Sequence, residues 1–317
     1  DANLLLGRLD VNKLKSVSEK VDLDHIRAIF QKKLGDPLNV DSETAAAAVL
    51  QVAITRMAGA TRMVSVSMGE DPRDFSLFAF GGAGPMHASA LARELGIPEV
   101  LVPARPGITN ALGCIVADLK HDFVRTINSP LNLADMQEIA AILKAQRDEG
   151  LELIRQEPVS IEETRVTHSL DMQFVGQTHI LQVSLRKDQI NRESIQLAFD
   201  EAYFGRFRVR LPEIRAQIVN IKTTVTGRRA SICLDGLIDP AGRARSLTKA
   251  QIGTRPVWFN GCWQDTQVFD REALPLDAKI KGPAVLEQMD TVVLIEPGDE
   301  AVSDKDGNIL VTLGTAE

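Results

Sequence analysis

The chain has 317 residues, enough for two or three domains, and a formal net charge of −7. Hydrophobic residues make up 44% and charged residues 25%, which is the composition of an ordinary soluble globular protein with enough apolar material for a core. Because binding to phosphate groups needs a basic surface, the acidic balance argues against nucleic acid or an anionic membrane as the main partner.

No apolar run approaches the roughly 18 residues that a membrane helix needs, and no signal-peptide pattern leads the sequence, so we expect a cytoplasmic protein. The cysteines Cys114, Cys233 and Cys262 are scattered, which argues against a disulfide framework and against a Cys-x-x-Cys zinc site. His121 and Asp122 are a lone pair of potential metal ligands, for which we favour a solvated or core-satisfied role.

The chain opens on Asp1-Ala-Asn-Leu-Leu-Leu-Gly-Arg-Leu9, without a methionine and as though inside a domain, so we expect a fragment. The spacing of apolar residues then predicts a helix over 21–33. Asp41 or Ser42 is expected to cap a long, alanine-rich helix that ends near Met68 and is buried against a sheet.

A strand, a tight loop and a helix are predicted in the stretch Phe75-Ser-Leu-Phe-Ala-Phe-Gly-Gly-Ala-Gly-Pro-Met-His87. Its three glycines permit positive φ angles and close approach of another molecule, and its proline suits the first turn of a helix. That helix is expected to end at Gly96, before a second strand at 100–103. In such β-loop-α-β units ligands lie beyond the carboxyl ends of the strands, which here means over the glycines.

Two interpretations of this loop stay open. Gly81, Gly82 and Gly84 either turn a tight corner only, or receive a ligand against bare backbone. Their spacing is not Gly-x-Gly-x-x-Gly, so a Rossmann-type site is the weaker interpretation, and no Lys-Ser or Lys-Thr follows as in a P-loop. A second loop begins at Pro103 and leads into a short helix at 110–117, so the two loops are expected to frame one crevice.

The rest of the chain mixes both kinds of element. We predict a strand at 122–127, an amphipathic helix at 133–156, a hairpin of strands 163–174 and 178–185, a helix at 190–204 and a strand at 214–226. Arg206, Arg208 and Arg210 are expected on one strand face, as a solvated or salt-bridged surface rather than a nucleic-acid strip.

Residues 234–254 show no periodicity and predict a loop. A small β-rich unit is expected to close the chain, with short strands at 256–259, 266–269, 284–288, 291–295 and 309–313.

Six stretches, spread over nearly the whole chain, carry a common resemblance. They are the opening nine residues, Gly69-Glu-Asp-Pro-Arg-Asp-Phe75, Phe80-Gly-Gly-Ala-Gly-Pro-Met-His87, Pro106-Gly-Ile-Thr-Asn-Ala-Leu-Gly113 with Ala117-Asp118, Phe174-Val-Gly-Gln177 and Gly282-Pro-Ala-Val-Leu-Glu287. In this order they resemble the hydantoinase A and 5-oxoprolinase family, which includes subunits of acetone and acetophenone carboxylases. Six stretches in one order are far more specific than a single loop.

The resemblance implies an α/β fold. Residues 1–127 would be the second half of an actin-like ATPase domain of the ribonuclease H-like (ASKHA) class, and residues 128–317 an α+β C-terminal domain with a β-rich end after the 234–254 loop. The family carries glycine- and threonine-rich phosphate loops upstream of the Asp-Ala-Asn stretch, and this sequence contains none. The chain alone would therefore bind nucleotide weakly, without the site for the β- and γ-phosphates.

The function implied by the resemblance is ATP-dependent activation of a small cyclic amide, such as a hydantoin or 5-oxoproline, by phosphorylation for ring opening. A divalent cation, Mg or Mn, and a hydantoinase B-type subunit or domain would complete the full-length enzyme. The alternatives are an ATP-dependent ketone carboxylase subunit and a non-catalytic subunit-docking module, and a homo-oligomer is compatible with each. Asn110 stands where the family more often has serine, and Tyr203 near a common histidine, which leaves the substrate open.

The resemblance also assigns site residues. It places adenosine or ribose against Gly81, Gly82, Ala83 and Gly84. Asp1 and Asn3 would lie near the catalytic cleft and hold metal or substrate, with a helix-capping role as an equal alternative. His87 would donate a hydrogen bond to a phosphate or to the substrate, with a structural role as its alternative.

Overall fold

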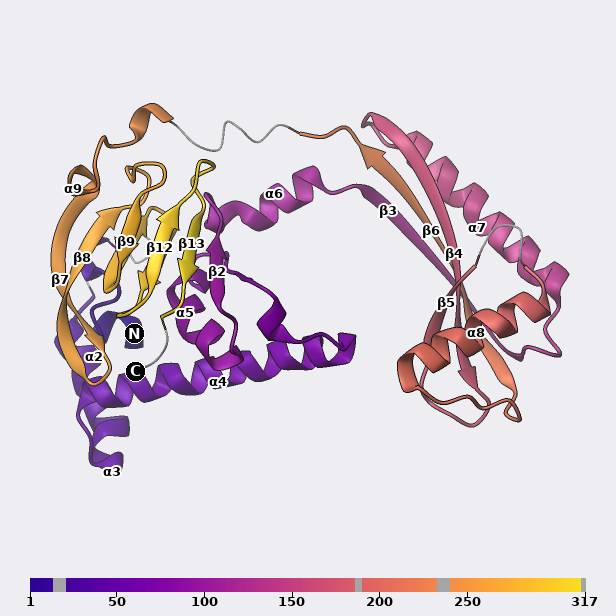
Figure 1. Ribbon diagram of the computed structural model, residues 1–317, viewed down its shortest axis with the longest axis horizontal. Coiled ribbons are helices and arrows are strands. Elements are labelled where there is room, and N and C mark those ends of the chain that lie inside the picture. Colours follow the sequence, from indigo (N-terminus) through magenta and orange to yellow (C-terminus); the bar gives the residue numbers. More distant parts are fainter. Residues whose placement is uncertain (14–20, 186–189, 233–239, 315–317) are drawn as a thin grey trace. The chain divides into compact units, whose positions relative to one another are not determined.

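The chain packs into two compact units, described by a computed structural model that covers residues 1–13, 21–185, 190–232 and 240–314 (Figure 1). Unit 1 is built from Asp1–Gly113 and Cys233–Glu317, and unit 2 from Cys114–Ile232. The predicted domains, 1–127 and 128–317, are each continuous in the chain, whereas unit 1 combines residues from both of them. The boundary between them stays a prediction about sequence domains.

Unit 1 combines helices with two sheets. Its helices are α1 (Ala2–Leu5), α2 (Leu23–Phe30), α3 (Asp36–Leu38), α4 (Ser42–Met68), α5 (Gly84–Leu95) and α9 (Leu247–Ala250), and α6 (Thr109–Val116) contains the boundary with unit 2. The first sheet has the order β1 (Leu77–Phe78), β2 (Glu99–Val102), β13 (Ile309–Thr312), β12 (Glu300–Ser303), β9 (Lys279–Lys281). The second has the order β11 (Thr291–Ile295), β10 (Ala284–Gln288), β8 (Cys262–Asp270), β7 (Gln251–Phe259).

The predicted strand-loop-helix-strand unit is confirmed. β1 is shorter than the predicted strand and pairs in parallel with β2, with Leu77 opposite Val100. α5 begins within the glycine loop and ends where Gly96 adopts a φ of 74°, a conformation that glycine reaches without strain. The carboxyl ends of β1 and β2 therefore lie side by side, and so do the loops that follow them.

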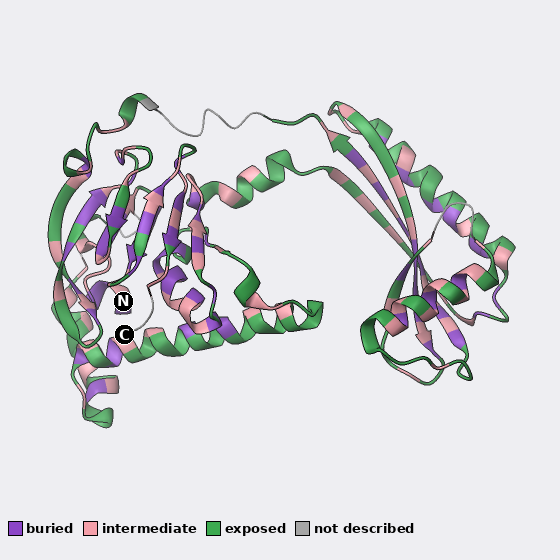
Figure 2. Cartoon of the chain, in the orientation of Figure 1, coloured by how far each residue is buried: buried purple, intermediate pink, exposed green. Residues whose placement is uncertain are grey.

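Helix α4 has the predicted bounds but not the predicted environment. Asp41 caps it, since its side chain accepts a 2.7 Å hydrogen bond from the Thr44 N–H. The expectation that α4 is buried against a sheet is wrong, because the helix is green, and thus exposed, over most of its length (Figure 2). It packs on α1 and α5 through a few small residues, among them Ala45, Ala46 and Ala58.

The predicted β-rich end is divided between both sheets of unit 1. β10 and β11 have the predicted bounds and form an antiparallel hairpin, with Leu286 opposite Val293. β13 pairs with β2 and with β12, so the end of the chain completes the sheet that carries β1. β9 and β12 were not predicted. Within the predicted 234–254 loop, α9 and the start of β7 occupy 247–254, and residues 234–239 lie outside the described residues.

One apolar core holds the two sheets of unit 1 and α5 together. Val100 and Val102 of β2, Phe269 of β8, Leu286 of β10 and Val311 of β13 belong to it, and each is at most 1% exposed. Burying a side chain of this size contributes about 1.5–3 kcal/mol, so this core fixes the position of β2 and of the loop beyond it.

Unit 2 is a four-stranded antiparallel sheet with two helices. The sheet has the order β3 (Leu119–Pro130), β6 (Ala216–Arg229), β4 (Ile161–Phe174), β5 (Leu181–Leu185), and the helices are α7 (Met136–Gln156) and α8 (Arg192–Phe207). The predicted hairpin is confirmed as β4 and β5, with Leu170 opposite Val183. The helices predicted at 133–156 and 190–204 are confirmed as α7 and α8.

The arginine strand predicted at 206–210 is wrong. Arg206 lies in the last turn of α8, and Arg208 ends that helix with a φ of 59°. The guanidinium group of Arg210 stacks over the Phe204 ring at 5.0 Å instead of following a strand face. No helix among the residues that the structure describes is both long and apolar enough to cross a membrane.

Candidate active site

The glycine corner, defined as Gly81, Gly82, Ala83 and Gly84, lies just beyond the carboxyl end of β1 and leads into α5. Gly82, Ala83 and Gly84 are exposed, and Gly81 is half-buried. A Cβ added at Gly81 or Gly84 would meet no atom within 4 Å, so bare backbone faces open space at both positions. Gly81 also has a φ of 83°, which a residue with a side chain reaches only with strain.

Hydrogen bonds fix this corner to its neighbours on one side. The Gly81 N–H donates to the Pro106 carbonyl at 2.8 Å, which joins the two loops that follow β1 and β2. The Thr291 hydroxyl donates to the carbonyls of Gly81 and Gly82, at 3.4 and 3.0 Å. Asp290 packs so closely on Gly107 that a methyl group there would collide with its carboxylate. The glycine corner is therefore fixed by contacts with Pro106 and Thr291, while the Cβ directions of Gly81 and Gly84 face open space.

Two of the predicted catalytic residues meet beside the corner. The Asn3 Nδ2 lies 3.3 Å from the His87 Nε2, although 84 positions separate them in the chain. When Asn3 donates to Nε2, the neutral ring carries its hydrogen on Nδ1. That Nδ1 atom and the Asn3 Oδ1 atom are buried without a hydrogen-bond partner in the described structure. Buried polar atoms are normally paired, so this pair has capacity for a ligand or for water.

His87 is held as a neutral base. Burial lowers the pKa of its imidazole below the usual value, and the nearby positive charge of Arg8 lowers it further. The ring can therefore accept a proton or donate its one N–H near neutral pH, but it is not a cation there.

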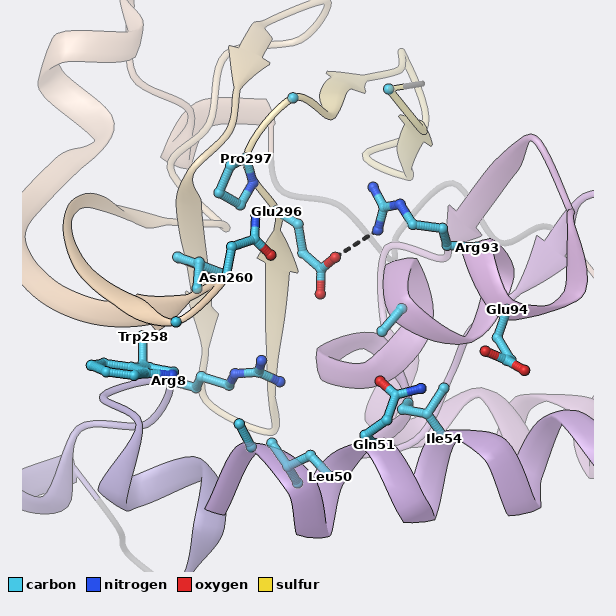
Figure 3. Close-up of a pocket in the computed structure, with 16 residues that line it drawn as sticks. Arg8, Leu50, Gln51, Ile54, Arg93, Glu94, Trp258, Asn260, Glu296 and Pro297 are labelled. Atoms are coloured by element: carbon cyan, nitrogen blue, oxygen red, sulfur yellow. Dashed lines mark hydrogen bonds and ion pairs between the residues drawn. The ribbon is translucent and has the colours of Figure 1, made fainter. Parts of the chain in front are cut away.

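Arg8 connects this pair to a cavity of about 1110 Å³ in unit 1 (Figure 3). Burial lowers the pKa of Arg8, opposed by the charge of Glu296, and the Arg8 Nε is a further buried atom without a partner among described residues. The residues that line the cavity do not include the glycine corner. In Figure 3 the Arg8 and Glu296 side chains project into the same space from different elements.

Arg93 of α5 closes one wall of the cavity through two ion pairs. Its guanidinium group lies 2.6 Å from the Glu296 carboxylate and 2.6 Å from that of Asp299, whose side chain is fully buried. Burial raises the pKa of Glu296, although the charges of Arg93 and Arg8 oppose the shift. Such an array can orient a polar ligand, since its charged groups are held in place before any ligand arrives.

Asp1, the third predicted catalytic residue, is not part of this cluster in the contacts observed. Its backbone carbonyl accepts from the Leu5 N–H, but its exposed side chain makes no capping hydrogen bond to α1. Among described residues there is also no group of three or more His, Cys, Asp or Glu side chains that could hold a metal ion. His121 and Asp122 accordingly lack a third ligand within those residues.

The sequence alone did not single out Arg8, Arg93 or Glu296 as functional. Arg8 lies inside the opening stretch that carries the family resemblance, and that position was the available signal. Glu296 stands just before a Pro-Gly turn, so the pattern around it indicated a turn and nothing of its ion pair with Arg93, which is 203 positions away.

The lowered pKa of His87 predicts a pH dependence of stability. In the unfolded chain His87 takes up a proton near its usual pKa of about 6.5, whereas in the folded protein the pKa is lower. As the pH falls, the unfolded chain is therefore protonated first. The free energy of unfolding is therefore expected to decrease below about pH 6.5 from this cause, and His87→Gln removes that component. Urea denaturation of both proteins at neutral and at mildly acidic pH measures the difference. Identical pH dependence in the two would contradict the assignment.

The fold and these residues define a class of protein: a mixed α/β protein with a glycine corner open to a ligand at the end of a parallel strand. Two sequence profiles match it, Hydantoinase/oxoprolinase over residues 1–123 and Hydantoinase/oxoprolinase C-terminal domain over residues 129–310. The chain belongs to the hydantoinase/oxoprolinase family.

Three relatives illustrate the range of the family. Caprolactamase subunit alpha of Pseudomonas jessenii is 28% identical over 99% of this chain, and the acetone carboxylase beta subunit of Xanthobacter autotrophicus is 26% identical over 96%. 5-Oxoprolinase 1 of Arabidopsis thaliana is 25% identical over all of it. The crystal structure of the ATP-dependent caprolactamase from Pseudomonas jessenii matches 99% of this chain with a TM-score of 0.80.

The chain spans less than half the length of each of these relatives: 46% of the caprolactamase subunit, 44% of the carboxylase subunit and 26% of the 5-oxoprolinase. The likeness therefore concerns one part of each larger protein, although it runs through both units described above.

Proposed function

We propose that this chain forms the nucleoside-binding part of an ATP-dependent enzyme that activates a small cyclic amide by phosphorylation. The observation that carries the proposal is the glycine corner, where Gly81 and Gly84 present backbone to open space at the carboxyl end of a parallel strand. A nucleobase or its ribose can approach such bare backbone closely, whereas a side chain there would hold the ligand away from it.

The finer fold assignment belongs to the same proposal. We assign residues 1–127 to the second half of an actin-like ATPase domain and residues 128–317 to the family's C-terminal domain. The parallel pair β1 and β2 with α5 between them is the local arrangement that this assignment requires. The ATP-dependent caprolactamase, which matches at a TM-score of 0.80, supports the use of ATP.

In this proposal the glycine corner receives adenosine or ribose, and the Asn3–His87 pair acts on the substrate or on a phosphate. Phosphorylation of the amide forms a bond between the amide oxygen and the γ-phosphorus of ATP and breaks the bond from that phosphorus to the bridging oxygen, which leaves with ADP. Water then attacks the activated carbon. Inorganic phosphate leaves and the ring C–N bond breaks, with a proton passing to the nitrogen, so that a carboxylate and an amine or amide group are formed. The neutral His87 is suited to accept the proton of that water. Asp1 is retained as a candidate for holding metal or substrate.

A divalent cation, Mg or Mn, would neutralise charge on the phosphates in this reaction. It stays a proposal, because its ligands are not identified among the residues described. The relatives named as subunits, caprolactamase alpha and acetone carboxylase beta, support a hydantoinase B-type subunit or domain as the partner. A cytoplasmic location and a homo-oligomer remain predictions.

The test is ATP hydrolysis by the intact gene product together with its partner subunit. We expect hydrolysis that is stimulated by a cyclic amide, either a hydantoin, 5-oxoproline or a lactam. Stimulation by ketones with bicarbonate, and by none of the amides, would instead favour a ketone carboxylase subunit. The acetone carboxylase relative supports that alternative. If no substrate and no partner elicits ATP hydrolysis, the enzyme proposal fails and a docking module remains.

A further inference from the structure

A second cavity of unit 1, of about 330 Å³, is lined by three arginines from separate parts of the chain. Arg105 follows β2 and precedes the turn at Pro106, Arg243 follows a turn that ends at Gly242, and Arg271 follows β8. None of them belongs to the glycine corner or to the Asn3–His87 pair. We call this cavity the arginine pocket. It shares no lining residue with the glycine corner, although Arg105 stands next to Pro106, whose carbonyl accepts the Gly81 hydrogen bond.

Arg271 is buried without a direct ion pair among the described residues. It is 3% exposed, and its Nη atoms donate to the Gln288 Oε1 at 3.1 Å and to the carbonyls of Val102 and Pro103 at 3.2 and 2.5 Å. Its Nε is buried without a partner, and no carboxylate of the described residues lies within ion-pair distance of it. Burial lowers the pKa of Arg271 to about 10, even with the charge of Asp290 opposing the shift. A charge buried in this way is costly unless something compensates it.

Arg243 repeats this pattern at the same cavity. Its Nη1 donates to the Leu274 carbonyl at 3.0 Å, its Nε is buried without a partner, and it has no ion pair within the described part of the chain. Burial lowers its pKa, and the positive charge of Arg105 lowers it further. The two arginines thus present two unsatisfied N–H donors, and backbone carbonyls take up most of their other observed hydrogen bonds.

Two carboxylates, those of Glu272 and Asp270, line the arginine pocket. Glu272 forms an ion pair with Arg105. The Asp270 Oδ1 accepts a 3.0 Å hydrogen bond from the Glu272 N–H. Of the three guanidinium groups, only that of Arg105 has a carboxylate partner at ion-pair distance among the residues that are described. The residues that line the pocket thus include three guanidinium groups and two carboxylates, and the charges of Asp290 and Asp304 act on Arg271 and Arg243 from nearby.

We propose that the arginine pocket binds an oxyanion, namely the phosphate or carboxylate group of a small molecule. Guanidinium groups match such groups because their planar N–H donors fit two oxygens at once, and three of them, on Arg105, Arg243 and Arg271, line this cavity. The volume of about 330 Å³ limits the ligand to a small molecule or to one end of a larger one. This site goes beyond the proposed reaction and does not depend on it.

The test compares thermal unfolding of the protein in inorganic phosphate, in malonate and in sodium chloride at equal ionic strength. We expect phosphate, malonate or both to raise the melting temperature saturably above the chloride value, because a ligand that binds only the folded state stabilises it. In Arg243→Gln the half-saturating concentration is expected to rise roughly tenfold, which corresponds to about 1.4 kcal/mol of binding energy. Arg245 is a neighbouring exposed arginine outside the pocket, so Arg245→Gln is the matched control. Its half-saturating anion concentration should equal that of the wild type.

Two further variants locate the site. Gly84→Val alters the glycine corner and should leave the rise in melting temperature with anions unchanged. A rise that this variant abolishes would place the phosphate at the nucleotide site instead of the arginine pocket. Arg105→Gln also removes a pocket charge and is expected to weaken anion binding too. It takes the place of Arg243→Gln in the test if that variant does not fold. A response to phosphate alone identifies a phosphoryl ligand, and a response to malonate a carboxylate ligand. If neither anion exceeds chloride, or if both pocket variants respond like the wild type, the proposal is wrong.

Discussion

Gly84→Val is expected to weaken binding of ATP to the intact enzyme by roughly tenfold or more and to leave the fold unchanged. A Cβ at Gly84 meets no protein atom within 4 Å, so the valine side chain would occupy the open space in front of the glycine corner rather than press on the chain. A loss of 1.4 kcal/mol already corresponds to a factor of ten in affinity, and a nucleoside lifted off the backbone loses more than one contact. Equilibrium binding with a fluorescent ATP analogue measures the change.

Gly205→Val is the control for that experiment. Gly205 lies in α8 of unit 2, its φ is ordinary, and an added Cβ there also meets no atom within 4 Å. Both variants therefore add the same side chain at an open helical glycine, but only one of them alters the corner. Equal affinities of Gly84→Val and Gly205→Val for ATP would show that the corner does not receive the nucleoside.

Phe199→Ala is expected to lower the free energy of unfolding by about 3–5 kcal/mol. The Phe199 ring is completely buried and meets the Phe174 ring edge-on at 4.9 Å, and the Tyr203 ring lies 4.7 Å from that of Phe174. Removing the ring leaves a cavity between α8 and β4 that these neighbours fill only in part. Urea denaturation followed by far-UV circular dichroism gives the change in stability.

Leu197→Ala provides the comparison on the same helix. Its side chain is 62% exposed, so its truncation removes little buried surface and should change the free energy of unfolding by less than about 1 kcal/mol. If Phe199→Ala costs no more than Leu197→Ala, the aromatic cluster is not the core of unit 2.

Local patterns were sufficient for elements whose signals lie within a few residues. β10 and β11 have the predicted bounds because the apolar residues Ala-Val-Leu that open β10 and the β-branched run Thr-Val-Val-Leu-Ile of β11 are separated by a short turn at Met289 and Asp290. The end of α5 at Gly96 follows from the same kind of signal, a glycine that takes up a left-handed conformation. The glycine corner itself was also predictable, since three glycines between a strand and a proline leave few other structures.

Partners distant in the chain could not be predicted in this way. The alanines of α4 indicate close packing but not which element packs there, so a sheet was expected where α1 and α5 lie. β12 and β9 have four and three residues, too few for a clear local pattern, and are held by their pairing, β12 with β13 and β9 with β12. Arg8 and Glu296 belong to one cavity for the same reason, because only the tertiary fold brings the two ends of the chain together.

The most direct test of the nucleoside assignment is to label the intact enzyme with an azido-substituted ATP and to map the modified peptide. The account predicts label on the peptide that contains the glycine corner and the start of α5, and loss of that label when unmodified ATP is added in excess. Label that ATP displaces from some other peptide, with none at residues 79–87, would contradict it.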